Sequence, residues 1–198
     1  MARKITTKAF DYIDSKLKAN GAAQDAIARK DARSLLNYAA EACVGIREVG
    51  GNNKGPLVQE IQKTVDNKAS SEAWCMAFVQ TMLAYVEKKL GVKSPIFESE
   101  HCLTVWGKTS KVQRVKSIPL PGAIIIWQHG KTTNGHTGFV MEFAGKTFEA
   151  VEGNTESGIV GDKVVRDGGG VYRTIRSTKK NGDMTIVGYL KPFAEVAK

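Results

Sequence analysis

The sequence has few cysteines and none of the long apolar runs that cross a bilayer. Three cysteines among 198 residues, with no C-x-x-C pair, argue against a disulfide framework and against a zinc ribbon. No stretch approaches the roughly 20 apolar residues that span a membrane, so we expect no membrane insertion. Residues 1–14 are interrupted by charges and contain no apolar signal core, so we expect no signal peptide and an initial location in the cytoplasm.

Positive charge is the main bias in composition. The formal net charge of +9 favours an anionic partner, either nucleic acid or another anionic polymer. The lysines and arginines are spread along the chain and are not interleaved with aromatic residues in one tract, so we predict no nucleic-acid site. A hydrophobic content of 42% and a charged content of 25% are ordinary for a folded globular protein.

The first half of the chain has helical periodicity. Apolar residues at three- and four-residue steps predict helices over residues 6–17, 31–44 and 57–65. Residues 22–30 fit either another turn of helix or a mobile connection. Glycine, asparagine and proline are concentrated in residues 48–56, which predicts an irregular loop. We expect residues 1–47 to form a helical extension that packs on, or leads into, a domain of residues 48–198.

Residues 70–90 are the most informative stretch. Their apolar positions predict an amphipathic helix with one buried stripe, made of Val79, Met82, Leu83, Val86 and Leu90. Ser70 or Ser71 is the expected N-cap, with Glu72 in the first turn and Gly91 at the end.

Cys75 therefore falls in or next to the first turn of this helix. Free N–H groups and the helix dipole favour a thiolate there, which is the form that a cysteine nucleophile requires. Taken alone, Cys75 also fits a small buried core residue, which is our interpretation of Cys43.

From residue 119 onward the periodicity becomes typical of strands. Apolar or alternating runs cover residues 122–128, 136–143, 147–152, 171–176 and 184–190. Ala144, Gly145 and Lys146 predict a hairpin turn between the second and third of these runs. Helices followed by hairpin-linked strands indicate an α+β fold with an antiparallel sheet.

A cysteine nucleophile needs a base and a group that orients the base. His129 lies in a polar turn, and His101 adjoins Cys102, but adjacent positions point apart. His136 begins an alternating strand, and the hairpin returns Glu152 beside it. Alone, His136 also fits a structural histidine, and Glu152 and Asn154 also fit a plain strand end and turn.

Four blocks in order carry a family resemblance: Glu-Ala-Trp-Cys-Met-Ala-Phe-Val (72–79), Pro-Gly-Ala-Ile-Ile-Ile-Trp (121–127), Gly-His-Thr-Gly-Phe-Val (135–140) and Val-Glu-Gly-Asn-Thr (151–155). Together they resemble the CHAP family, the cysteine, histidine-dependent amidohydrolases/peptidases. The resemblance covers roughly residues 48–192.

The resemblance implies a papain-like fold, with the nucleophile helix packed on an antiparallel sheet. It implies that Cys75 is the nucleophile, His136 the general base and acid, Glu152 the residue that orients the imidazole, and Asn154 an accessory polar group. Pro-Gly-Ala replaces the family's common Pro-Gly-Asp. We find no Asp-rich loop before Cys75, so we expect no metal and no cofactor.

The activity implied is hydrolysis of amide bonds in bacterial peptidoglycan, by an endopeptidase or an N-acetylmuramoyl-L-alanine amidase. We expect a monomeric phage endolysin that stays in the host cytoplasm until release. An antibacterial effector with the same chemistry, and a non-catalytic wall-binding or phage structural protein, remain alternatives. Trp74 and Trp127 fit either core positions or surfaces that stack on substrate.

Overall fold

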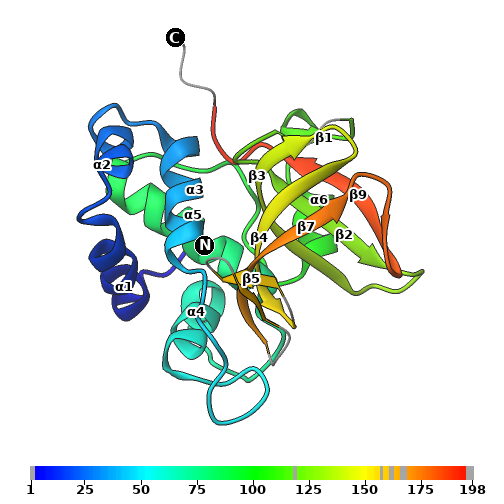
Figure 1. Ribbon diagram of the computed structural model, residues 1–198, viewed down its shortest axis with the longest axis horizontal. Coiled ribbons are helices and arrows are strands. Elements are labelled where there is room, and N and C mark those ends of the chain that lie inside the picture. The colour runs from blue at the N-terminus through cyan, green and yellow to red at the C-terminus, as the bar shows by residue number, and fades with distance from the viewer. Residues whose placement is uncertain (1–2, 118–119, 157, 161–162, 166–168, 195–198) are drawn as a thin grey trace.

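The computed structural model describes residues 3–117, 120–156, 158–160, 163–165 and 169–194. Within them a layer of helices packs against an antiparallel sheet (Figure 1), so the predicted α+β, papain-like fold is confirmed. Among these residues, no helix combines the length and the apolar character that crossing a membrane requires.

Helices make up most of the first half of the described chain. They are α1 (Thr7–Leu17), α2 (Gly21–Ala28), α3 (Ala32–Ala42), α4 (Pro56–Asp66), α5 (Cys75–Leu90) and α6 (Cys102–Lys108). Residues 22–30 thus contribute to a helix, α2. The side chains of Asn20 and Asp31 cap α2 and α3 by accepting hydrogen bonds from the N–H groups of Ala23 and Ser34.

Helix α5 lies at the centre of the molecule. It packs on α3 and α4 on one side and on β3 and β4 on the other. Every residue of α5 except Glu87, Lys88 and Lys89 is buried. The prediction of a single buried stripe was therefore wrong, because a helix enclosed between two layers buries its whole circumference.

The strands form one antiparallel sheet in the order β1-β9-β2-β3-β4-β7-β5-β6, with β8 paired to β9. Their bounds are β1 (Arg114–Val115), β2 (Ile124–His129), β3 (Gly135–Ala144), β4 (Thr147–Thr155), β5 (Gly158–Val160), β6 (Lys163–Val165), β7 (Gly170–Ser177), β8 (Lys180–Asn181) and β9 (Met184–Leu190). The predicted hairpin joins β3 to β4, with Gly145 at a φ of 75° in the turn.

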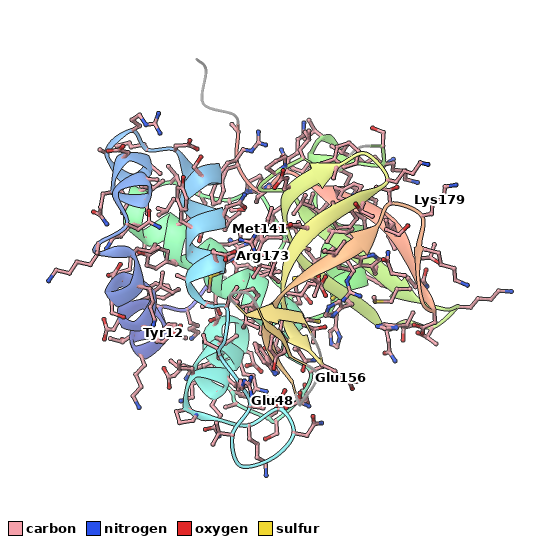
Figure 2. All side chains as sticks on the ribbon, viewed as in Figure 1. Tyr12, Glu48, Met141, Glu156, Arg173 and Lys179 are labelled. Atoms are coloured by element: carbon pink, nitrogen blue, oxygen red, sulfur yellow. The ribbon has the colours of Figure 1, made fainter. Side chains whose placement is uncertain are left out.

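The two faces of the sheet bury different clusters of side chains. One face contributes Phe139 and Val151 to a large core shared with α5 and with the helices before it. The other buries a smaller cluster that includes Trp127 and Phe148. Arg173 of β7, labelled in Figure 2, also ties the layers together, because its guanidinium pairs with Glu41 of α3 and Glu149 of β4.

Candidate active site

Cys75 is the first residue of α5, and its side chain is nearly buried. The N-cap residue is Trp74, which offers no side-chain cap to the helix. The N–H groups of the first turn are therefore left for other partners, and the N–H of Met76 hydrogen-bonds with the Cys75 sulfur. The prediction of a Ser70 or Ser71 N-cap with Glu72 in the first turn was wrong, since the helix starts later.

The β3–β4 hairpin brings His136 and Glu152 together. His136 lies at the start of β3 and Glu152 near the end of β4, so the antiparallel return places them side by side. His136 Nε2 lies 2.8 Å from Glu152 Oε2. Because Nε2 is bound to the carboxylate, Nδ1 is the ring nitrogen that remains for the sulfur of Cys75, with which His136 hydrogen-bonds.

Gly138 makes this approach possible. A Cβ atom at this position would lie 2.6 Å from Glu152 Cγ and 2.7 Å from the carbonyl oxygen of Val151. Contacts this short are not tolerated, so only glycine lets the Glu152 side chain cross β3 toward His136.

We expect Gly138→Ala to destabilise the protein by about 3 kcal/mol and to lower its activity, because the new methyl group must displace β4 or the Glu152 side chain. Gly107→Ala is the matched control. Gly107 lies within α6, where an added Cβ meets nothing within 4 Å, so alanine should be neutral or stabilising by up to about 1 kcal/mol. Thermal unfolding of both variants tests the pair, and equal stability would contradict the close approach at Gly138.

Glu152 is fully buried, and its charge is balanced from β7. The guanidinium of Arg176 donates two hydrogen bonds to its carboxylate, from Nε to Oε1 at 2.8 Å and from the Nη2 group to Oε2. The hydroxyl of Thr174 donates to Oε1 at 2.5 Å. With His136 on Oε2 as well, both carboxylate oxygens are satisfied, as a buried charge requires.

Trp127 supports the same group of charges through its ring. The indole stacks on the imidazole of His136, with centroids 5.6 Å apart and an interplanar angle of 22°. The guanidinium of Arg176 lies 5.5 Å from the Trp127 ring centroid. The ring therefore restricts the motion of His136 and of Arg176, the arginine that holds Glu152.

The electrostatics favour an ion pair between Cys75 and His136. Burial by itself would raise the pKa of Glu152, but the hydrogen bonds and charges of Arg176 and His136 lower that pKa to about 2. Burial would lower the pKa of His136, but hydrogen bonds and charges from Cys75 and Glu152 raise that pKa to about 10. The imidazole is therefore protonated at neutral pH.

The thiol of Cys75 is correspondingly acidic. The hydrogen bond from Cys102 lowers its pKa most, burial opposes this, and His136 and the N–H of Met76 lower the pKa further, to well below the usual value. Cys75 and Cys102 face each other with their sulfurs 3.8 Å apart. The arrangement can supply a thiolate nucleophile and a protonated imidazole within one buried cluster.

Comparison with known proteins agrees with this geometry. Residues 67–154 match the family model of the CHAP domain. No curated protein matches the sequence. The match supports the CHAP family and, in general terms, a peptidoglycan hydrolase, since CHAP domains are typically cysteine-dependent hydrolases. Cys75, His136 and Glu152 all lie inside the matched residues.

Asn154 lies away from the cluster of charged groups, although it falls within the CHAP match. It adopts a φ of 54° at the end of β4 and makes no hydrogen bond with Cys75, His136 or Glu152 among the described residues. It instead lines a cavity of about 760 Å³, together with Glu48 and Glu156. Figure 2 labels these two glutamates. Its expected role as an accessory group of the cluster has no support in the contacts.

The two tryptophans that were candidate stacking surfaces are both fully buried. The indole N–H of Trp74 donates to Glu48 Oε1 at 2.9 Å, which fixes the residue immediately before Cys75. Trp127 packs under His136 as described above. Neither ring exposes a face to solvent, so of the two alternatives both are core residues and the candidate role in stacking on substrate is corrected.

The remaining histidines lie outside the cluster. His129 is the last residue of β2, so its predicted place in a turn was wrong; it is partly exposed, with Nδ1 3.1 Å from Asp183 Oδ2. His101 is exposed ahead of α6. In the described residues, no group of three or more His, Cys, Asp or Glu side chains is arranged to hold a metal ion.

Three residues of the cluster were not predicted from the sequence: Thr174, Arg176 and Cys102. The alternation in residues 171–176 contained a signal, because Tyr172, Thr174 and Arg176 share one face of a strand whose residues are largely buried. A charged residue on such a face needs a buried counter-charge. Cys102 gave no comparable signal, since its position opposite Cys75 depends on how α6 packs against β2 and β3.

Proposed function

We propose that this protein is a phage endolysin that hydrolyses amide bonds of bacterial peptidoglycan, as an endopeptidase or an N-acetylmuramoyl-L-alanine amidase. The observation that carries the proposal is the linked arrangement of Cys75, His136 and Glu152 at the N-terminus of α5, within the CHAP match. The net charge of +9 supports attraction to an anionic wall. In this proposal the enzyme remains in the host cytoplasm until release.

The reaction begins with attack of the Cys75 thiolate on the carbonyl carbon of the scissile amide. The negative charge that develops on the carbonyl oxygen is stabilised by N–H groups of the first turn of α5, which lack partners within the helix. The His136 imidazolium then gives its proton to the leaving nitrogen, the C–N bond breaks, and a thioester on Cys75 remains.

Hydrolysis of the thioester returns the enzyme to its first state. The now neutral imidazole of His136 takes a proton from a water molecule, which attacks the thioester carbonyl. The C–S bond breaks and the Cys75 thiolate leaves, with a new carboxyl group on the product. Glu152 holds the imidazole through Nε2 in both steps, so that the other ring nitrogen faces the reacting atoms.

The direct test is mass spectrometry of soluble fragments released from purified peptidoglycan by the wild type and by Cys75→Ala. New amino termini released only by the wild type, without free muramoyl carboxyl groups, would support an endopeptidase. Free muramoyl carboxyl groups, with new amino termini on alanine, would support an amidase. If the folded, reduced wild type released nothing from walls of several chemical types, the proposal would fail and a wall-binding role would gain support.

The raised pKa of His136 predicts the alkaline side of the pH dependence. Leaving-group protonation requires the imidazolium, so kcat/KM for a soluble wall fragment should be sustained through neutral pH and fall as the pH passes about 10. A pH profile recorded at constant ionic strength measures this. An alkaline fall near pH 6.5, the ordinary histidine value, would contradict the ion pair.

A further inference from the structure

The second thiol beside the nucleophile lowers the pKa of Cys75 but forms and breaks no bond in the hydrolytic steps above. Cys102 is the first residue of α6, and its sulfur lies 3.8 Å from that of Cys75. Both are free cysteines with about 5% of their surfaces exposed, Cys102 at 5% and Cys75 at 6%. Two thiols from separate segments of the chain therefore meet inside the candidate active site.

The packing of α6 on the sheet places Cys102 close to Cys75. A Cβ atom at Gly135, the residue before His136, would lie only 2.9 Å from Cys102 Cβ, so glycine allows Cys102 to sit close against the start of β3. A disulfide has an S–S distance of about 2.05 Å, so the two sulfurs need to approach by roughly 1.8 Å. Rotation of a cysteine side chain about χ1 moves its sulfur through distances of this size.

The two sulfurs are also chemically unequal. The Cys102 thiol donates a hydrogen bond to the Cys75 thiolate, which, with burial, raises the pKa of Cys102 well above its usual value while the pKa of Cys75 is lowered. Cys75 is thus the nucleophilic sulfur, and Cys102 keeps its proton until Cys75 reacts. This is the usual division between a sulfur that is oxidised first and one that resolves it.

We propose that Cys75 and Cys102 form a reversible oxidation site whose substrate is a hydroperoxide, with hydrogen peroxide as the simplest case. The Cys75 sulfur attacks one peroxide oxygen, an S–O bond forms, the O–O bond breaks, and the departing oxygen takes up a proton and leaves as water. Cys75 is then a sulfenic acid.

The Cys102 sulfur completes the reaction by attacking the sulfenic sulfur. An S–S bond forms, the S–O bond breaks, and hydroxide combines with the Cys102 proton and leaves as a second water. Two thiols have then lost two electrons, and one peroxide has become two water molecules. The oxidised protein lacks its nucleophile, and a dithiol reductant restores it by exchange.

Cys43 provides an internal comparison. It lies at the end of α3, fully enclosed, with its sulfur 4.0 Å from the Met82 sulfur. Burial raises the pKa of Cys43, so this thiol is less acidic than the thiol of Cys75. Cys43 also has no partner thiol within the cluster. Oxidation should therefore select Cys75 and Cys102 and spare Cys43.

The experiment treats the full-length protein with hydrogen peroxide and follows the cysteines by mass spectrometry. The wild type should lose two hydrogen atoms, yield a peptide cross-link between Cys75 and Cys102, and leave Cys43 open to alkylation after denaturation. Wall hydrolysis should fall at least about tenfold and return after treatment with a dithiol. The cross-link is detected without any activity assay, so its absence is distinguishable from a failure of the proposed hydrolase function.

Cysteine variants distinguish the role of Cys75 from that of Cys102. In Cys102→Ala, and in Cys102→Ser if alanine impairs folding, Cys75 should gain two or three oxygen atoms that a dithiol does not remove. Cys43→Ala should form the cross-link as the wild type does. Resistance of the wild type to peroxide, a cross-link that involves Cys43, or irreversible oxidation of Cys75 at the same rate with and without Cys102 would each overturn the proposal.

Discussion

Replacing Cys75 by alanine is expected to lower the rate of wall hydrolysis by about 10⁴-fold or more, because the variant has no atom that can attack the scissile carbonyl. Cys75→Ser should be nearly as inactive. A serine hydroxyl is far less acidic than a thiol, so the neighbouring His136 cannot maintain it as an anion. Release of soluble fragments from purified walls measures both variants.

Cys43→Ala is the matched control for these changes. Cys43 is a buried cysteine of the helical layer and lies outside the charged cluster. Its replacement should cost about 1 kcal/mol of folding stability at most and leave hydrolysis intact. Lysis that survives in Cys75→Ala, with circular dichroism showing a native fold, would rule out Cys75 as the nucleophile.

The second large effect is expected from Glu152→Gln. The amide can still lie beside His136, but it carries no charge to stabilise the imidazolium and can present an N–H to the ring, so kcat should fall by about 10³- to 10⁴-fold. The same change leaves the Arg176 guanidinium without its counter-charge. Because this side chain is only 20% exposed, we expect a loss of about 3 kcal/mol in the free energy of unfolding.

Arg176→Met separates the catalytic contribution from the structural one. This variant keeps the bond between His136 and Glu152, so its kcat should exceed that of Glu152→Gln even if the two variants are equally destabilised. Arg176 holds the pKa of Glu152 down, so its removal raises that pKa and the acid side of the pH profile should move to higher pH.

The double variant Glu152→Gln with Arg176→Met completes a thermodynamic cycle. Removing both charges avoids an unpaired buried ion, so the double variant should be more stable than the sum of the single effects predicts. Additive losses of stability would show that the two charges are not coupled. A kcat for Arg176→Met as low as that for Glu152→Gln would contradict the expectation that Glu152 still supports His136 without the arginine.

The sequence was sufficient to predict the pairing of His136 with Glu152. A glycine turn between two alternating runs defines a hairpin, and a hairpin fixes which residues become neighbours. Local sequence patterns therefore predicted that His136 and Glu152 lie side by side, and that a helix begins near Cys75.

Contacts between distant segments could not be predicted in the same way. Arg176 reaches Glu152 because β7 pairs with β4. The sequence between these strands, which includes β5 and β6, does not indicate the register of that pairing. Cys102 meets Cys75 through the packing of a short helix against the sheet. The burial of Trp74 and Trp127 likewise depends on layers that only the folded chain brings together.

The enclosure of α5 has a consequence for the motions of the protein. Because α5 is covered on both sides, we expect its amide hydrogens to exchange with solvent only when the helical layer separates from the sheet, and therefore among the slowest in the protein. The nucleophile is thus carried at one end of the segment that opens last.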